Sequence, residues 1–253
     1  MRRILEQLLW RCRAALLRYR FSYRHTGERV CPEVPDANYE AHRQVYRFMA
    51  QFVQGREVLD VGCGTGYGSH HLLQSGAARV TGIDYSPQAV AYARRTFPDS
   101  RLFFEQMDAG HLVFADASFD VVCSSENIEH LPDPEANAAE MRRVLRRGGI
   151  LLLGTPNKEI SSPDSGKSPN PFHLREFTYA ELEGLLRRHF ASVHIFENTL
   201  ESGSETGRRM KAQRRAGGRL GIEAGGRDSV VLEGRRVELG ELRNTHSFMA
   251  LCW

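Results

Sequence analysis

Four side chains combine the types that bind a divalent metal ion or move a proton. Glu126, Glu129 and His130 lie close together in the chain, and His173 follows later. Residues at i, i+3 and i+4 share one face of a helix, so the first three would converge if their segment is helical. Two carboxylates and two imidazoles give a mixed oxygen and nitrogen set that suits Mn²⁺, Mg²⁺ or Zn²⁺. In the alternative without a metal ion, His130 or His173 acts as a general base, and Glu126 contacts a bound cofactor.

A glycine-rich turn at residues 58–68 provides a second site for chemistry. It reads Val-Leu-Asp-Val-Gly-Cys-Gly-Thr-Gly-Tyr-Gly, and glycines let a ligand approach the backbone without Cβ clashes. Its glycines alternate, whereas dinucleotide-binding turns follow G-x-G-x-x-G. Asp60 precedes them, where an acid suits a cationic ligand better than a pyrophosphate. Asp84 ends the next predicted strand, where it can accept hydrogen bonds from ribose hydroxyls. The turn favours S-adenosylmethionine, with a nicotinamide dinucleotide as the alternative.

The stretch from Val58 to Asn157 resembles the class I S-adenosylmethionine-dependent methyltransferases. The matching segments follow family order: V-L-D-V-G-C-G-T-G, V-T-G-I-D-Y-S at 80–86, Asp108-Ala109, F-D-V-V-C-S-S-E at 119–126 and R-V-L-R-R-G-G at 143–149. The resemblance implies a cofactor site in which Asp60, Gly62 and Gly64 contact the methionine moiety and Asp84 holds the ribose. It also implies that Asp108 binds the adenine amino group, with Ala109 beside it and Tyr85 in the same set.

The Glu-x-x-Glu-His segment resembles two methyltransferase groups. These are the ubiquinone-biosynthesis O-methyltransferases and the small-RNA 3′-terminal 2′-O-methyltransferases, which add a later histidine to complete a metal site. The resemblance makes Glu126, Glu129, His130 and His173 the metal ligands. The chain lacks an obvious RNA-binding domain. Its segments N-P-F-H-L-R-E-F at 170–177 and T-G-E-R-V-C-P-E at 26–33 look more like methyltransferases of bacterial glycan assembly.

The elements that must position these residues alternate between strand and helix patterns. Strands are predicted at 57–61, 79–84, 101–105, 119–124, 149–154, 190–197 and 247–253, and helices at 39–53, 67–75, 87–97, 134–146 and 178–188. Residues 158–171 are predicted to form a loop. This alternation predicts an α/β fold: a single doubly wound, Rossmann-like, mainly parallel seven-stranded sheet with helices on both faces.

Residues 39–253 are predicted to form the methyltransferase domain, with a mobile insertion at 201–229 that is rich in glycine and basic residues. Residues 1–38 are predicted to be an amphipathic helix over 1–20 followed by a lead-in. The apolar face of that helix favours packing against the domain. Two other interpretations stay open, contact with an anionic membrane surface and an organelle-targeting leader.

The composition of the chain limits the kinds of partner molecule that we expect it to bind. The chain has 253 residues, 41% hydrophobic and 26% charged, with a net charge of +3, so a nucleic acid partner is not expected. Its five cysteines form no C-x-x-C pair, which fits a reducing cytosol. We expect a cytoplasmic O-methyltransferase of a sugar, glycan or small-metabolite hydroxyl, with peripheral membrane contact through residues 1–20 left open. The alternatives are an RNA-end or amine acceptor and a non-catalytic partner in a glycan-assembly complex. The oligomeric state is not predicted.

Overall fold

The computed structural model describes residues 30, 37–162, 168, 170–197, 223–224, 229–232, 235–238 and 247–253. The strands of its main sheet are β1 (Glu57–Val61), β2 (Arg79–Asp84), β3 (Leu102–Gln106), β4 (Phe119–Ser125), β5 (Leu145–Pro156), β6 (Val193–Glu197) and β10 (Ser247–Cys252). The helices are α2 (Ala37–Ala50), α3 (Tyr67–Gln74), α4 (Pro87–Thr96), α5 (Pro134–Val144), α6 (Lys158–Ser161) and α7 (Tyr179–Arg187), with a 3-10 turn η1 (Ile128–His130).

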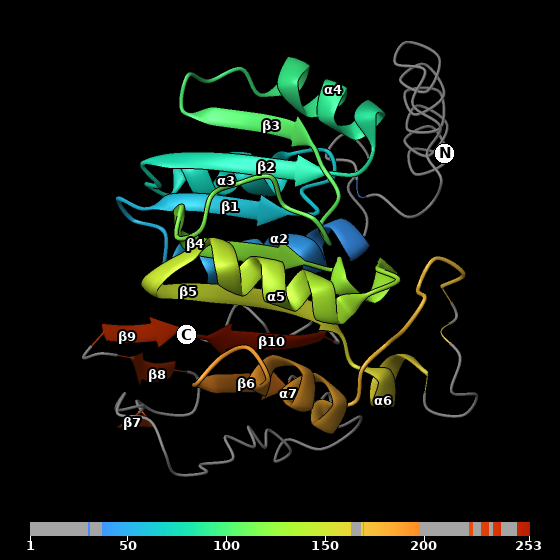
Figure 1. The fold of residues 1–253 in the computed structure, drawn as a ribbon. Helices are drawn as coiled ribbons and strands as arrows, with labels where there is room; N and C mark the ends of the chain where they lie inside the picture. Colours follow the sequence, from blue (N-terminus) through green and yellow to red (C-terminus); the bar gives the residue numbers. More distant parts are fainter. Residues whose placement is uncertain are drawn as a thin grey trace, which may run out of the picture.

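The seven strands form one sheet in the order β3-β2-β1-β4-β5-β10-β6 (Figure 1). Neighbouring strands from β3 to β5 are parallel, whereas β10 is antiparallel to both β5 and β6. The order reverses between β1 and β4, and ligands of such sheets bind beyond the carboxyl ends of the strands at that switch point. The predicted mainly parallel seven-stranded sheet is confirmed.

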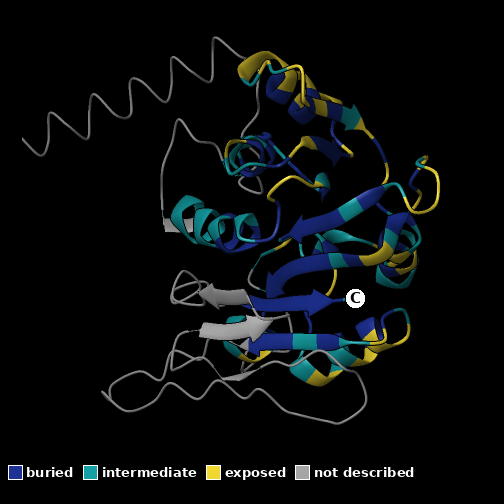
Figure 2. Cartoon of the chain, turned by 90° about the vertical axis from the view of Figure 1, so that its left-hand side faces the viewer, coloured by how far each residue is buried: buried dark blue, intermediate teal, exposed yellow. Residues whose placement is uncertain are grey.

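Helices cover both faces of the sheet, as predicted. Side chains of α2, α3 and α4 pack with one face, and side chains of α5 and α7 pack with the other. Figure 2 shows the central strands as almost wholly buried between these layers. Several helices begin at residues whose side chains cap the first turn. Ser86 accepts from the amide of Ala89, and Thr178 forms a reciprocal capping box with Glu181.

Some predicted boundaries need correction. Strand β5 runs from Leu145 to Pro156 and is longer than the predicted 149–154. It starts earlier because Leu145 already pairs with Phe119 of β4, and regular pairing resumes at Ile150 after a shift in register. The predicted loop over 158–171 begins with a short helix, α6, whose first turn is capped by Asn157. A second sheet, β7 (Glu223–Ala224), β8 (Ser229–Leu232) and β9 (Arg235–Glu238), was not predicted.

Parts of the predicted organisation lie outside the described residues. These are the helix over 1–20, nearly all of the lead-in to residue 38, and most of the insertion at 201–229, of which only 223–224 and 229 are described. Cys63 and Cys123 are buried and have free thiols. Among the helices that the structure describes, none is long and apolar enough to span a membrane.

Candidate active site

The glycine turn joins β1 to α3 and is fastened to the end of β2. Gly62, Gly64 and Gly66 have φ of 75°, 54° and 82°, a region that favours glycine. The amide of Gly62 donates to the carbonyl of Ile83 at 2.9 Å, and the amide of Gly64 donates to Asp84 Oδ2 at 2.9 Å. The local backbone therefore positions the Asp84 carboxylate directly beside the turn.

The glycines of this turn meet different surroundings. A Cβ added at Gly62 would lie 2.4 Å from Oδ1 of Asn127, so this glycine is required by close packing. A Cβ added at Gly64 would meet nothing within 4 Å, so this side of the turn is open. An open backbone at the carboxyl edge of a parallel sheet fits a bound nucleoside cofactor.

Asp60 lies behind the turn and is fully buried. Its carboxylate accepts hydrogen bonds from the hydroxyls of Ser69, at 2.6 Å, and Tyr46, at 3.1 Å. Burial raises the pKa of Asp60 to about 6, against the lowering effect of these two hydrogen bonds. Asp60 is therefore ionised at neutral pH and places negative charge under the turn, which suits a cationic ligand. Its direct contact with a methionine moiety stays a prediction.

The remaining predicted cofactor residues lie along the ends of β2 and β3. Asp84 also accepts from the amide of Ser86 at 2.8 Å, which fixes the carboxylate. Tyr85 is 76% exposed beside it and can cover a bound ligand. Asp108 is exposed and accepts from the amide of Gly110, so it caps a turn. The carbonyl of the neighbouring Ala109 accepts from Nδ2 of Asn137, a fully buried side chain that sequence reasoning missed.

Glu126 follows the end of β4 in a strained conformation. Its φ is 50°, which non-glycine residues rarely adopt and which costs about 1–3 kcal/mol. Its Oε1 accepts from the hydroxyl of Ser247 on β10 at 2.8 Å. Burial raises the pKa of Glu126 to about 7, partly offset by that hydrogen bond. The strained turn holds an ionisable carboxyl at the carboxyl edge of the sheet.

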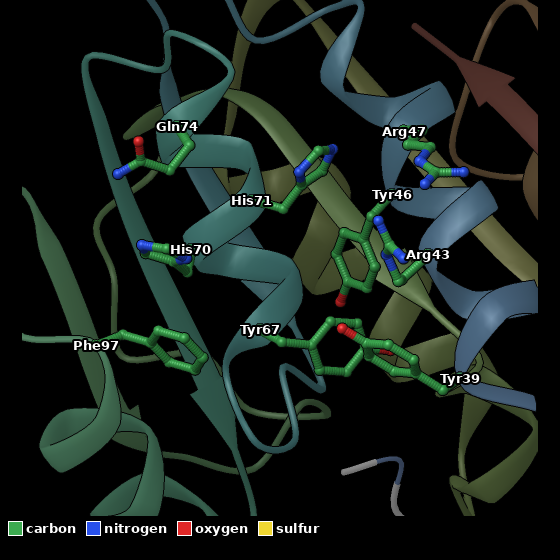
Figure 3. A pocket seen from close by; sticks show the side chains of 9 residues that line it. All are labelled: Tyr39, Arg43, Tyr46, Arg47, Tyr67, His70, His71, Gln74 and Phe97. Atoms are coloured by element: carbon green, nitrogen blue, oxygen red, sulfur yellow. The ribbon is translucent and has the colours of Figure 1, made fainter. Parts of the chain in front are cut away.

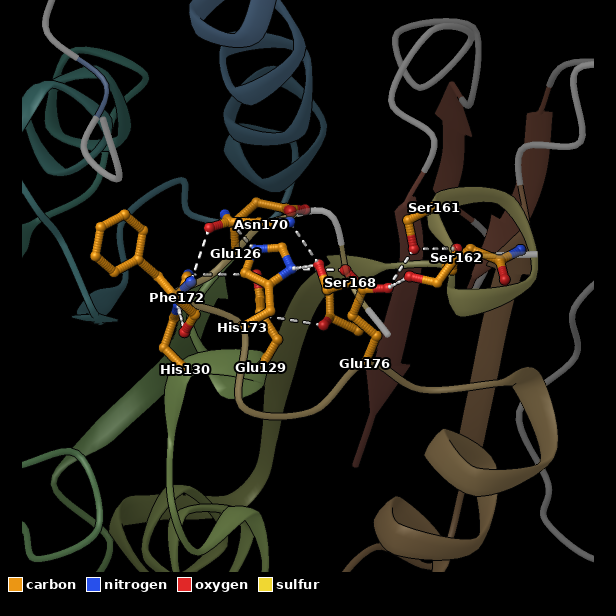
Figure 4. Close-up of polar contacts among 12 residues, drawn as sticks. Glu126, Glu129, His130, Ser161, Ser162, Ser168, Asn170, Phe172, His173 and Glu176 are labelled. Carbon is orange, nitrogen blue, oxygen red and sulfur yellow. Dashed lines mark hydrogen bonds and ion pairs between the residues drawn. The ribbon is translucent and has the colours of Figure 1, made fainter. Parts of the chain in front are cut away.

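Glu129, His130 and His173 form a cluster whose candidate ligand atoms all lie within 4.8 Å of one another (Figure 4). Glu129 is fully buried, and its Oε2 accepts from the hydroxyl of Thr155 at 2.9 Å. Its Oε1 has no hydrogen bond within the described part of the chain and lies 3.8 Å from Nε2 of His130. Burial raises the pKa of Glu129 well above its usual range, and Glu126 adds to the effect. A buried carboxylate oxygen without a donor needs a proton or a cation.

The two imidazoles are oriented through their Nδ1 atoms. Nδ1 of His130 lies 3.0 Å from the carbonyl oxygen of Phe172, which can only accept, so this nitrogen carries the proton. Nδ1 of His173 lies 2.7 Å from Oε1 of Glu176. In a neutral ring each Nε2 is then the nitrogen with the lone pair, the form that ligates a metal or accepts a proton. Nε2 of His173 accepts from Nδ2 of Asn170 at 2.8 Å.

Glu176 is a supporting residue that sequence reasoning missed. It is buried, and its Oε2 accepts from the hydroxyls of Ser161 and Ser162 at 2.5 and 2.6 Å. Burial alone would raise its pKa, but hydrogen bonds from these serines, Ser168 and His173 hold the pKa at about 2. Glu176 is therefore a permanent acceptor for His173. Its position three residues after His173 was the available signal.

The structure brings together three of the four predicted ligands. Glu126 is outside the group that the described residues form and is hydrogen-bonded to Ser247 instead. The helix assumed for residues 126–130 is wrong, because only Ile128–His130 form a single 3-10 turn. His173 reaches the cluster because the amides of Leu174 and Arg175 donate to the carbonyl of Glu129, which fastens its loop to the turn.

Comparisons with known proteins bear on the family and the fold of the chain. Residues 59–153 match the family model described as a methyltransferase domain. A probable S-adenosylmethionine-dependent methyltransferase of Mycolicibacterium smegmatis is 42% identical over 64% of this chain and 62% of its own length. A ubiquinone biosynthesis O-methyltransferase of Idiomarina loihiensis is 37% identical over 43% of this chain and 45% of its own length.

A solved S-adenosylmethionine-dependent methyltransferase from Mesorhizobium loti shares the fold, with a TM-score of 0.53 and 24% identity over 62% of this chain and 84% of that chain. The chain spans about three fifths of the length of the mycobacterial relatives that it matches. Residues 59–153 therefore form a class I S-adenosylmethionine-dependent methyltransferase domain.

Proposed function

We propose that this protein is an O-methyltransferase that transfers the methyl group of S-adenosylmethionine to a hydroxyl of a sugar, glycan or small metabolite, with a divalent metal ion bound beside the acceptor. The observation that carries this proposal is the convergence of Glu129, His130 and His173 within 4.8 Å, with an unsatisfied buried oxygen on Glu129.

The cofactor half of the site fits S-adenosylmethionine. The open backbone at Gly64 gives access to the turn, and Asp84 presents a fixed carboxylate for ribose hydroxyls. The buried charge of Asp60 favours a cationic sulfonium over a pyrophosphate. S-adenosylmethionine supplies an activated methyl group, so the protein must align donor with acceptor and exclude water.

The acceptor half of the site must remove the proton of the acceptor hydroxyl, because a neutral hydroxyl is a weak nucleophile. Asn127 connects the two halves, since its side chain packs against Gly62 and it lies between Glu126 and the cluster. The cluster is therefore adjacent to the cofactor turn. Without a metal, Nε2 of His130 or His173 would accept the hydroxyl proton, and for His173 this requires that the hydroxyl displace Nδ2 of Asn170, which donates to that atom.

The cluster fits a divalent ion better than a lone general base. It offers one carboxylate oxygen and two imidazole nitrogens, a set suited to Mn²⁺, Zn²⁺ or, with added water, Mg²⁺. Metal-ligating histidines typically donate their other N–H to a carboxylate or a backbone carbonyl, and Glu176 and Phe172 provide these acceptors. An ion held by Glu129, His130 and His173 would lower the pKa of a bound hydroxyl. Glu126 is near enough to raise the pKa of Glu129 and remains a candidate for a further ligand or for cofactor contact.

The proposal is tested by titrating Mn²⁺ into protein saturated with S-adenosylhomocysteine, for the wild type, His173→Ala and His189→Ala. His189 is a matched control, because it also pairs with one glutamate and has a similar side-chain exposure, 18% against 12% for His173. We expect saturable binding that is at least tenfold weaker only in His173→Ala, since a ligand is lost. Methyl transfer to vicinal-diol sugars should then require added Mn²⁺ or Mg²⁺ and stop with a chelator. If the wild type binds no metal ion, the metal-assisted mechanism is ruled out, and a histidine acting as general base is the mechanism that remains.

A further inference from the structure

Two exposed apolar side chains flank His173 beside the proposed metal site. Among the described residues five large apolar side chains are exposed, and Phe172 and Leu174 are two of them, with exposed fractions of 38% and 64%. Isolated apolar side chains are common on protein surfaces. This apolar pair differs from them in its position, because it adjoins a candidate ligand on both sides, where the acceptor of the proposed reaction would lie.

The backbone of the apolar pair is fixed to the cluster. The carbonyl oxygen of Phe172 accepts from Nδ1 of His130 at 3.0 Å, and its amide donates to Oδ1 of Asn170 at 3.0 Å. The amide of Leu174 donates to the carbonyl of Glu129 at 2.9 Å. The contacts that orient the candidate ligands therefore also set the position of both apolar residues.

The side chains of the apolar pair face solvent. His173, which lies between them, is directed inward and has only 12% of its side chain exposed. Figure 4 shows the ring of Phe172 directed away from the imidazoles of His130 and His173. A bound group can contact this ring only if it extends beyond the reacting hydroxyl. Apolar surface that is held in water at a fixed place favours a ligand that covers it.

A pocket of about 310 Å³, lined mainly by helices α2 and α3, does not adjoin the apolar pair (Figure 3). Its lining includes Tyr46, whose hydroxyl donates to Asp60 behind the glycine turn. Residues 128–130 and 170–177, which the structure describes, do not line it. The pocket therefore adjoins the cofactor half of the site, and the acceptor half has the apolar pair instead.

On the basis of the function proposed above, we propose that the acceptor is a glycoside with an apolar alkyl or aryl group, its hydroxyl at the cluster and that group against Phe172 and Leu174. The polar cluster and the apolar pair match the two ends of such a molecule. A free sugar would reach the cluster but leave both apolar side chains in water. Each methylene group buried against them would strengthen binding about fourfold. Phe172 and Leu174 would therefore determine which acceptors are selected.

The test is calorimetric titration of methyl and hexyl β-D-glucopyranoside into protein saturated with S-adenosylhomocysteine, without added metal. The variants are Phe172→Ala and Leu174→Ser. Phe103→Ala and Val113→Ser are matched controls, because Phe103 is 39% exposed and Val113 is 72% exposed. We expect the hexyl glycoside to bind the wild type and both controls at least tenfold more tightly than the methyl glycoside. That advantage should fall at least fivefold in Phe172→Ala and in Leu174→Ser.

Several results would overturn the proposal. Equal affinities of the two glycosides for the wild type, or no binding of the hexyl glycoside, would show that the apolar group is not recognised. The same loss in Phe103→Ala as in Phe172→Ala would mean that the chain binds anywhere on the surface. Sedimentation with phosphatidylcholine vesicles that depends on Phe172, without binding of the hexyl glycoside, would assign the apolar pair to a membrane surface. A dimer that Leu174→Ser dissociates would assign it to a second copy of the chain.

Failure of this proposal is distinguishable from failure of the proposed function. The titration involves neither a metal ion nor methyl transfer, so a protein that binds no Mn²⁺ can still show the preference for the hexyl glycoside. Conversely, a protein that binds Mn²⁺ through His173 but does not distinguish the two glycosides would keep the metal site and lose the apolar acceptor.

Discussion

Replacing Glu176 with glutamine tests whether this buried carboxylate supports the proposed metal site through the neighbouring His173. Its pKa of about 2, against 4.5 for an ordinary glutamate, corresponds to roughly 3 kcal/mol in favour of the ionised form at 1.36 kcal/mol per unit. Four hydrogen-bond donors produce that preference, and His173 is one of them. The interaction with His173 is therefore on the order of 1 kcal/mol, which is about a factor of five in affinity.

We expect Glu176→Gln to bind Mn²⁺ about fivefold more weakly, just below the 10- to 100-fold range for lost supporting hydrogen bonds. The assay counts bound Mn²⁺ by electron paramagnetic resonance in the presence of S-adenosylhomocysteine. Glu183→Gln is the control, because Glu183 pairs with a surface arginine on α7. A Kd for Glu176→Gln within twofold of the wild type, with unchanged circular dichroism, would refute the role of Glu176 in orienting His173.

Three further predictions concern stability and pH. Gly62→Ala should lower the free energy of unfolding, measured by urea denaturation, by about 2 kcal/mol more than Gly148→Ala does. Both glycines have φ near 76°, but only a side chain at position 62 would clash with a neighbour. The stability advantage of wild type over Glu176→Gln should be complete above pH 4.5 and vanish as pH falls toward 2, since the folded-state pKa is depressed. Tyr46→Phe should lower stability by about 1–2 kcal/mol and raise the pKa of Asp60 above 6, because a hydrogen bond that lowers that pKa is lost.

Each of these has a result that contradicts it. Equal costs at the two glycines would mean that the neighbouring side chain moves aside without penalty. A wild-type advantage that is the same at every pH between 2 and 6 would mean that folding does not depress the pKa of Glu176. Unchanged pH dependence of S-adenosylhomocysteine affinity in Tyr46→Phe would show that Asp60 does not sense that hydroxyl.

The sequence predicted the sheet well because local pattern and global fold agree there. Apolar runs that alternate with helical segments specify parallel strands, because each helix forms the crossover that parallel strands need, and the boundaries of β1 and β2 match the prediction. The glycine turn was equally visible, since only glycine adopts positive φ without strain. Ser86 caps α4 through an equally local contact, since its side chain accepts from the amide of Ala89.

The candidate site was predicted in composition but not in geometry. Glu129, His130 and His173 converge through a 3-10 turn and a fastened loop, and neither depends on helical periodicity. The partner of Glu126 is Ser247, which is 121 residues away in the chain, and such a contact has no local signal.

Strand β10 follows both β5 and β6 in the chain but lies between them in the sheet. A ribosome delivers residues in order, so a nascent chain that has already made β5 and β6 cannot join them until residues 247–252 emerge. During that interval the edge of β5 presents unpaired backbone groups, which is a hazard for association with other chains. Ser247 also arrives at Glu126 only at that moment. Synthesis of this protein should therefore produce a late intermediate in which the glycine turn is assembled but Glu126 still lacks the hydroxyl of Ser247.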